Sequence, residues 1–362
     1  MSIDAIDEAP ASSGGAGSLK PVLDVIPARA YENPTWKGMS YFGRDVACYG
    51  GLVTALIFLS NPVYVIPIEI IMALVVVSLF VVGHDAAHGA LFKTKRLNQV
   101  VGRLAMMPSW HVYEAWVLGH NRIHHPFTVR QGYDFVWHPV SAQEYADMSR
   151  TRKFQHRIHW AWYGAGLYYG MEIWWNKMIN FTPPTRWVKA IRRDRVYTYS
   201  FVLGAAGFLS LLGAIRTHSV LGTLWMVCRI EVIPFALFCG LIGTVVHVHH
   251  VQPGIRWWKK AEWTKFKGQM EGTTVLRVPK GMNFFLHWIM IHTPHHVDMR
   301  IPMYNLDLAA TAIKKHFPDI VHDAPLRFKD FRKNTRICKL YDFEIGQWMT
   351  YAEGRRRIAS AL

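Results

Sequence analysis

The sequence has few charged residues and few cysteines. Charged residues make up 18% of the 362 residues, against about a quarter in an average soluble domain, so the composition favours a membrane protein. Four cysteines occur, and no two of them form a Cys-x-x-Cys pair: Cys48, Cys228, Cys239 and Cys338. Their number and spacing exclude a disulfide scaffold and a thiolate zinc finger.

Two histidine motifs of soluble metalloenzymes are also missing. The chain has no His-Glu-x-x-His, which argues against a zinc protease. None of its glutamates is followed three residues later by His, so the Glu-x-x-His of soluble di-iron bundles is absent.

Acidic residues are outnumbered by basic ones. The 41 Lys and Arg against 25 Asp and Glu give a net charge of +16, which suggests an anionic partner, either nucleic acid or an anionic lipid surface. No nucleic-acid-binding module accompanies the charge, and we therefore expect no nucleic-acid partner.

The apolar residues come in four blocks, at residues 47–60, 62–83, 197–215 and 220–246. As a helix, the second block rises about 33 Å, enough to cross a bilayer. Asn61-Pro62 and residues 216–219 are turn signals, so the blocks predict four transmembrane helices in two hairpins. Arg229 and Glu231 interrupt the last block; they are either functional residues or a mutual ion pair.

Charge also predicts the orientation. All the Lys and Arg residues except Arg216 and Arg229 lie outside 47–83 and 196–250, which makes their side cytoplasmic. Residues 1–35, rich in Ala, Gly, Ser and Pro, predict a disordered tail. Residues 307–362 are mostly polar with a helical pattern, and we expect them to cap a cytoplasmic helical domain. Aromatic residues crowd 160–175 and indicate a helix in the membrane interface or a shallow core helix.

Histidine is the unusual residue. Of 19 histidines, 11 fall in four clusters: His84 and His88; His120, His124 and His125; His247, His249 and His250; and His292, His295 and His296. Residues spaced three and four apart share one helix face. Two hairpins bring all four clusters to the cytoplasmic ends of the helices, where they can converge on one metal site.

The ligand type leaves the metal open. Imidazole suits iron, zinc, copper and nickel. A single catalytic zinc takes three protein ligands, whereas eight or nine histidines can fill two metal sites and leave open positions. Two metals with imidazole ligands beside a membrane favour oxygen activation over hydrolysis. The sequence therefore predicts an all-α integral membrane protein with a His-rich dimetal site held by a cytoplasmic helical cap.

The ordered motifs resemble those of the membrane fatty acid desaturase superfamily, and most closely its bacterial acyl-lipid branch. The first stretch is Gly83-His-Asp-Ala-Ala-His-Gly, followed by Gly119-His-Asn-Arg-Ile-His-His-Pro. Glu271-Gly-Thr-Thr-Val precedes the third stretch, His292-Thr-Pro-His-His, with its tail at 300–306. The resemblance implies a catalytic domain over residues 36–306 in the bacterial inner membrane, with the active site facing the cytoplasm.

The resemblance also implies the metal ligands. Eight lie in the three histidine boxes: His84, His88, His120, His124, His125, His292, His295 and His296. The family places a ninth seven residues before a Trp, which gives His250 from Trp257. Because His249 stands where the family has Gln, His249 and His247 remain alternatives. His287, Asp85, Asp134 and Asp298 are either supports of the ligands or ordinary polar residues.

The implied reaction is O2-dependent desaturation of a fatty acyl chain at two iron ions. The acyl group is carried by a lipid, coenzyme A or acyl carrier protein. No His-Pro-Gly-Gly stretch occurs, so the electrons are expected from a separate ferredoxin or cytochrome b5-like donor. A hydroxylase, ketolase or acetylenase of the same superfamily, acting on a lipid or carotenoid, is the first alternative. A metal transporter is a weaker one, because transporters place ligands near the bilayer midplane, and a purely structural metal site is weaker still.

Overall fold

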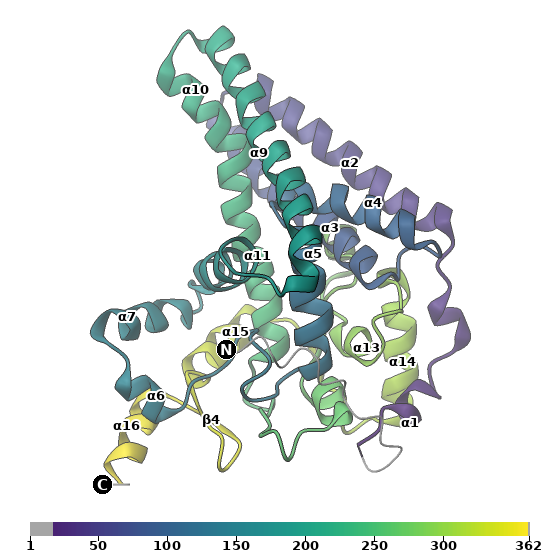
Figure 1. Ribbon diagram of the computed structural model, residues 1–362, viewed down its shortest axis with the longest axis vertical. Helices are drawn as coiled ribbons and strands as arrows, with labels where there is room; N and C mark the ends of the chain where they lie inside the picture. The colour runs from purple at the N-terminus through teal and green to yellow at the C-terminus, as the bar shows by residue number, and fades with distance from the viewer. Residues whose placement is uncertain (1–16, 361–362) are drawn as a thin grey trace.

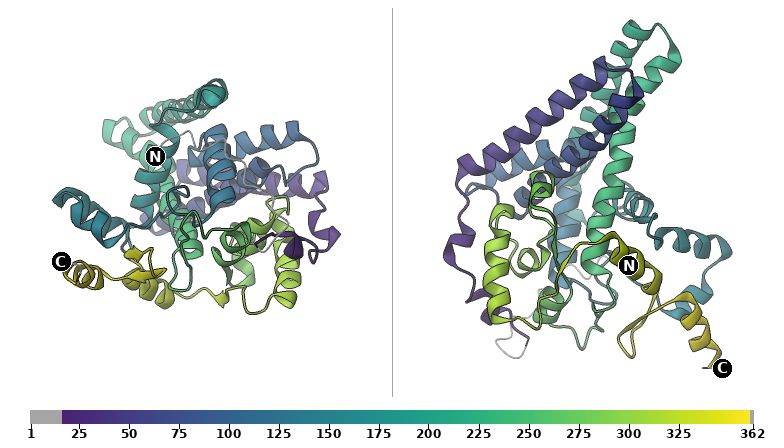
Figure 2. Two further views of the ribbon diagram at one scale, coloured as in Figure 1. Left: turned by 60° about the horizontal axis from the view of Figure 1, so that its bottom comes forward. Right: turned by 180° about the vertical axis from the view of Figure 1, so that it is seen from behind.

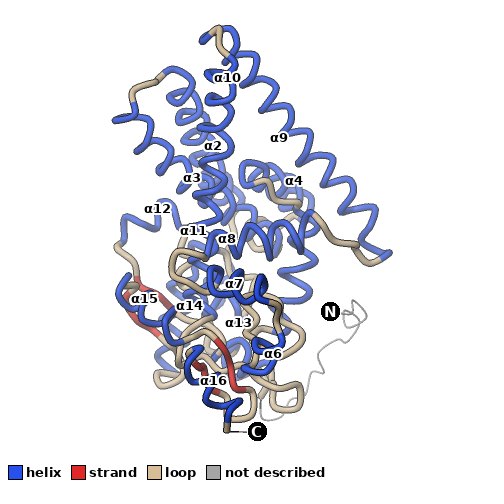
Figure 3. The backbone as a smooth tube through the Cα atoms, turned by 90° about the vertical axis from the view of Figure 1, so that its left-hand side faces the viewer, coloured by secondary structure: helices blue, strands red, loops and turns tan. Residues whose placement is uncertain are grey.

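The computed structural model describes residues 17–360, which are mostly helical. Long helices gather at one end of the molecule, and shorter helices and loops form a cap at the other (Figure 1). Two small sheets depart from the predicted all-α fold (red in Figure 3). Strand β1 (Val275–Arg277) pairs in parallel with β2 (Asp323–Pro325), and β3 (Leu340–Asp342) pairs antiparallel with β4 (Gln347–Met349). Each strand has three residues, too few for a periodic signal in the sequence.

The first hairpin consists of α2 (Thr35–Phe58) and α3 (Pro62–His88). Asn61 caps α3 by accepting a hydrogen bond from the Val63 amide at 2.9 Å, and Pro62 occupies the first helical position. Helix α3 ends at Gly89, whose φ of 74° suits glycine. Because α3 continues past the predicted residue 83, its last turn carries His84 and His88.

The second hairpin consists of α9 (Val188–Thr217) and a long bent helix. That helix runs through α10 (Val220–Val227), the π-helical turn η8 (Cys228–Val232) and α11 (Ile233–His250). Within the described residues Arg229 and Glu231 form no ion pair; the Nη1 of Arg229 instead donates to the Leu59 carbonyl at 2.9 Å, at the turn of the first hairpin. This contact joins the turn of the first hairpin to the second helix of the second hairpin, beyond α10.

Three helices of the described chain are long and apolar enough to cross a membrane: Pro62–His88, Thr185–Thr217 and Val220–His250. The second of these, Thr185–Thr217, combines the short helix η7 (Thr185–Trp187) with α9. Helix α2 is 24 residues long and packs on α3. It is not among these three helices, and its first half carries Lys37, Arg44 and Asp45, which lower its mean hydropathy.

The cap begins with α4 (Lys95–Met106), η3 (Met107–Ser109) and α5 (Tyr113–Trp116), and continues into the π-helix η4 (Val117–His124) and η5 (His125–Phe127). Its later part contains η9 (Lys267–Glu271), η10 (Lys280–Met282), α12 (Asn283–Leu286), α13 (His292–Val297), η11 (Met303–Asn305), α14 (Leu306–His316), α15 (Phe328–Ile337) and α16 (Tyr351–Ala359). These elements surround the cap-side ends of α3 and α11 (Figure 1).

A lateral arm, residues 142–179, projects beside the cap (Figure 2). It contains α6 (Ala142–Asp147), α7 (Arg150–His159), α8 (Ala165–Tyr168) and the π-helix η6 (Tyr169–Ile179). Its α8 packs closely on α11, because a Cβ on Gly243 would collide with the Ala165 carbonyl. Helix α16 packs on α6 and holds the outer end of the arm.

The predicted N-terminal tail is folded in its described part. Residues 1–16 lie outside the described residues, but residues 17–35 contain α1 (Lys20–Leu23) and η2 (Ala28–Tyr31). Val22 and Ala30 are fully buried in the main core. Burial of these apolar side chains against the cap stabilises residues 17–35. The average composition of the segment did not reveal this burial.

Candidate metal centre

Imidazoles from all four histidine clusters meet where the long helices enter the cap. His84 and His88 lie in the last turn of α3, and His250 lies at the end of α11. The remaining imidazoles come from η4, η5 and α13. Eight of these imidazoles form two neighbouring groups. Within each group, every member has a ring nitrogen that lies within 4.8 Å of a ring nitrogen of each other member.

The first group has five members: His84, His88, His120, His125 and His295. The Nε2 atoms of His84 and His120 are 2.8 Å apart, and those of His120 and His125 are 3.1 Å apart. His88 Nε2 lies 3.3 Å from His84 Nε2. All five side chains are at least largely buried.

The second group has three members: His124, His250 and His296. His292 adjoins this group, with its Nε2 3.1 Å from His296 Nε2 and its ring 5.3 Å from that of His250. The eight box histidines and His250, predicted from the sequence, thus lie together.

The nitrogen spacings fit metal ions. Ligands at 2.0–2.1 Å from one metal are about 2.8–3.4 Å apart along the edges of octahedral or tetrahedral shells, close to the Nε2–Nε2 distances of 2.8–3.3 Å within the two groups and to His292. Both ring nitrogens of the buried His295 lack a hydrogen-bond partner among the described residues. Buried polar atoms without partners cost free energy, so this donor set suits a bound cation.

A π-helical turn divides the second cluster between the groups. Along η4 the His125 amide donates to the His120 carbonyl, five residues back. This winding brings His125 to the same side of the helix as His120. His120 and His125 belong to the first group, and His124 belongs to the second.

Hydrogen bonds orient the second group. His124 Nδ1 donates to Asp134 Oδ1 at 2.9 Å, and His250 Nδ1 donates to the Gly272 carbonyl at 3.0 Å. His296 Nδ1 lies 3.1 Å from both Gln269 Oε1 and Thr128 Oγ1. Each contact leaves Nε2 for the centre, as outer partners of metal-bound histidines do.

Burial favours the neutral form of several imidazoles of the site. Burial, followed by neighbouring imidazoles, lowers the pKa of His120, His125 and His295 well below the usual value. The same causes lower the pKa of His292 and His296. Neutral imidazole is the form that binds a metal.

The other predicted residues take different positions. His249 Nδ1 contacts Thr274 Oγ1 at 3.0 Å, and its ring stacks on His292 with centroids 4.3 Å apart. His247 packs between Trp137 and Phe331, away from both groups.

Among the four polar candidates, only Asp134 hydrogen-bonds a histidine of the two groups. Asp85 lies 3.4 Å from His84 and accepts from the Met303 amide. Asp298 pairs with Arg300 at 2.6 Å. His287 contacts Asp45 on α2 at 2.6 Å. Sequence reasoning missed Gln269, Thr128 and Gly272, since none stands in a histidine motif.

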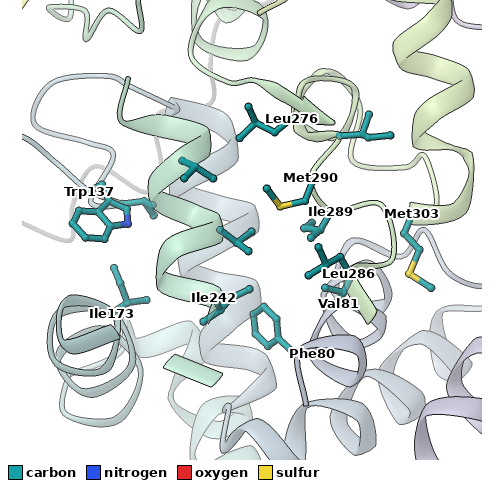
Figure 4. Close-up of a cluster of buried hydrophobic side chains, with 14 of the residues drawn as sticks. Phe80, Val81, Trp137, Ile173, Ile242, Leu276, Leu286, Ile289, Met290 and Met303 are labelled. Atoms are coloured by element: carbon teal, nitrogen blue, oxygen red, sulfur yellow. The ribbon is translucent and has the colours of Figure 1, made fainter. Parts of the chain in front are cut away.

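An apolar cavity reaches both groups. It encloses about 740 Å³ when the space at its open mouth is included. His84 and His120 line it from the first group, and His124 and His250 line it from the second. Figure 4 shows five of its apolar lining residues within the buried cluster: Phe80, Val81, Ile173, Ile242 and Ile289.

Comparisons with known proteins indicate the family of the chain. Residues 60–328 match a family model described as fatty acid desaturase. The chain is 26% identical to an sn-1 oleoyl-lipid 12-desaturase of Picosynechococcus sp., over 94% of both chains. It is 28% identical to an sn-1 acyl-lipid omega-3 desaturase (ferredoxin) of Nostoc sp., over 82% of this chain and 80% of the relative. A chloroplastic omega-6 fatty acid desaturase of Glycine max is 26% identical over 90% of this chain and 74% of the relative.

Proposed function

The chain belongs to the fatty acid desaturase family, and from this premise we propose that it introduces a C=C bond into the acyl chain of a membrane lipid with O2 and external electrons. The observation that carries the proposal is the apolar cavity that ends on both histidine groups. The names of the Picosynechococcus and Nostoc relatives state an oleoyl-lipid and an acyl-lipid substrate, which supports a lipid substrate for this chain.

The proposed ligands are the eight box histidines and His250. One metal is assigned to the group of five, and the other to His124, His250 and His296 with His292 beside them. Iron is the metal we propose, and when bound the pair supplies the O2-dependent oxidant that removes hydrogen from an unactivated methylene. Asp134, Gln269 and Gly272 hold the second group in place.

The chain's own task is to position the substrate. The walls of the cavity exclude water and hold an extended acyl chain against the histidine groups. Trp116 stacks on His120 with centroids 4.5 Å apart and lines the same cavity. A shift of the acyl chain by one C–C bond would change the position of the product double bond, so this wall sets the regiochemistry.

The membrane topology is also proposed. Four spans, with α2 as the fourth beside the three apolar helices, would place both hairpin turns on one side and the cap on the cytoplasmic side of a bacterial inner membrane. The Nostoc relative is named for ferredoxin, which supports a separate, acidic ferredoxin-like donor docking on the basic cap.

Product analysis tests the function. Purified protein in lipid nanodiscs, supplied with ferredoxin, its reductase, NADPH and O2, is expected to yield acyl chains lighter by two hydrogens in mass spectrometry. The variant His120→Ala should abolish this product. Acyl chains heavier by one oxygen would instead support the hydroxylase alternative, and metal uptake into vesicles without any lipid product would support the transporter.

A further inference from the structure

A second pocket, whose lining includes charged side chains and histidines, adjoins the apolar cavity. It lies between α7 and η6 in the lateral arm and has a volume of about 620 Å³ including its open mouth, and we term it the α7 pocket. Phe135 and Lys177 line both the pocket and the cavity. A molecule with an apolar chain and a polar end could therefore occupy both at once, with its polar end beside Lys177.

Cations outnumber carboxylates in this pocket. Its charged lining residues are Arg152, Lys177 and Glu172. Glu172 Oε1 lies 3.7 Å from Arg152 Nη1, and Glu172 Oε2 accepts from Asn176 at 3.1 Å. Lys177 makes no ion pair among residues 17–360. The excess positive charge suits a ligand with a single negative charge, such as a phosphodiester.

Two buried histidines add neutral hydrogen-bonding groups. His156 is 9% exposed and His159 is 5% exposed. His156 Nδ1 contacts the Tyr351 hydroxyl at 2.9 Å, while its Nε2 has no partner within the described chain. Burial lowers the pKa of His156 to about 3 and lowers that of His159, so both are neutral near pH 7. A buried nitrogen without a partner favours a polar ligand nearby.

The outer side of the same arm is apolar. Tyr163, Leu167, Met171 and Trp175 recur every four residues and are 45–63% exposed. This stripe follows α8 and η6, whose other side packs on α11. An exposed aromatic and aliphatic stripe on such a segment is typical of a helix lying in the membrane interface. The α7 pocket therefore lies at the level of lipid headgroups.

We propose that the α7 pocket binds the phosphate-bearing headgroup of a glycerophospholipid while one of its acyl chains lies in the apolar cavity. The inference rests on the proposed function, because it takes the cavity as the acyl site. Coenzyme A also carries phosphates, but a soluble thioester needs no membrane-facing stripe beside its pocket. The headgroup, held at Lys177 and Arg152, fixes the distance from the carrier to the histidine groups and so selects the methylene that reacts.

The test compares binding and turnover in two variants that each remove two positive charges. Arg152→Gln with Lys177→Gln changes the pocket. The matched control, Arg150→Gln with Lys189→Gln, changes exposed residues of α7 and α9 that do not line it. Native mass spectrometry measures retention of dioleoyl phosphatidylglycerol, and dioleoylglycerol serves as the probe without phosphate. Desaturation of both probes and of oleoyl-coenzyme A is measured in parallel.

The pocket variant is expected to bind dioleoyl phosphatidylglycerol at least about tenfold more weakly, to raise its KM with little change in kcat, and to retain dioleoylglycerol as wild type does. The conservative variant Lys177→Arg, with Arg152 intact, should bind dioleoyl phosphatidylglycerol as wild type does. Equal loss in the control variant, or unchanged binding in the pocket variant, would overturn the headgroup site. Wild-type turnover of oleoyl-coenzyme A without turnover of the phospholipid would overturn the lipid carrier. If no acyl substrate is desaturated, the proposed function fails, while the binding measurement still decides the pocket.

Discussion

At the residue scale, the two histidine groups differ in what their second ring nitrogen contacts. His124, His250 and His296 each have an Nδ1 partner, whereas the Nδ1 atoms of His84, His88, His125 and His295 have no hydrogen bond within the described chain. Outer partners orient a metal ligand and raise its basicity. We therefore expect a metal bound at the second group to depend on residues outside the histidine motifs.

The substitution Asp134→Asn tests this dependence. Asp134 accepts from His124 and from the Val129 and Val136 amides, so loss of its charge should weaken the second metal about 10- to 100-fold. Metal content after mild chelation, measured by elemental analysis, is expected to fall toward half. Asp298→Asn is the control, since Asp298 pairs with Arg300 instead of a histidine. Equal metal loss in both variants would contradict the assignment.

Buried histidines also predict a pH dependence for the metal-free protein. Burial lowers the pKa of His111 to about 3 and lowers that of His120, His125 and His295. Their pKa in the unfolded chain is about 6.5. Below that pH the unfolded state binds protons that the folded state refuses, so the free energy of unfolding falls as pH falls, by roughly 1.4 kcal/mol per such histidine per pH unit.

Thermal unfolding of metal-stripped protein in detergent measures this effect. The Tm is expected to stay nearly constant between pH 8 and about pH 6.5 and to decrease steadily below it. A Tm that is flat down to pH 5.5 would mean that the imidazoles are not buried as the structure has them.

The sequence predicted those residues of the candidate centre that lie in local histidine motifs. All eight box histidines and His250 lie in or beside the two groups. Gln269, Thr128 and Gly272 were not predictable, because their contacts are made across elements far apart in the sequence. Asp134 was one of four polar candidates, and only the fold distinguishes it from Asp298.

At the element scale, helix winding decides which of the two groups each histidine of the second cluster joins. A regular α-helix would present His120 and His124 together and turn His125 aside. The i→i+5 bond from His125 to His120 instead brings His125 into the first group. Sequence spacing indicates a shared face but does not distinguish α from π winding, so this division could not be predicted.

The close contact of α8 with α11 gives a second prediction. On α11, a Cβ at Gly243 would collide with the Ala165 carbonyl, whereas one at Gly240 meets open space. Gly243→Ala should therefore destabilise the protein by about 1–3 kcal/mol through overpacking. Gly240→Ala should be neutral or stabilising by up to about 1 kcal/mol, because alanine has less freedom to lose on folding. Thermal unfolding of the two variants, three residues apart on one helix, measures the difference, and equal Tm values would contradict this packing.

At the scale of the whole molecule, the hairpins place the metal centre at one end of the spans. The four apolar blocks predicted four transmembrane helices, and three helices of the described chain are long and apolar enough to cross a membrane. The blocks end too early on the cap side, where α3 and α11 continue into the histidine clusters. Charge and hydropathy indicate which residues lie in the membrane. The extensions of α3 and α11 are instead stabilised by burial within the cap, which these two properties do not indicate. The small sheets and the folded residues 17–35 are likewise products of tertiary packing.

Labelling of single cysteines tests the proposed topology. In a background without the four native cysteines, Asn61→Cys and His218→Cys stand at exposed hairpin turns, and Gln143→Cys stands on the exposed face of the cap-side arm. A membrane-impermeant maleimide should label the two turn positions in intact cells and position 143 only after permeabilisation. Labelling of the two turns from opposite sides would exclude four spans.

Metal content is the measurement that tests the central claim most directly. Elemental analysis of detergent-purified protein, with a His124→Ala variant beside it, is expected to give about two iron atoms per chain, falling toward one in the variant. One zinc atom per chain, or a metal content that His124→Ala leaves unchanged, would contradict the two-metal histidine centre and with it the proposed desaturation.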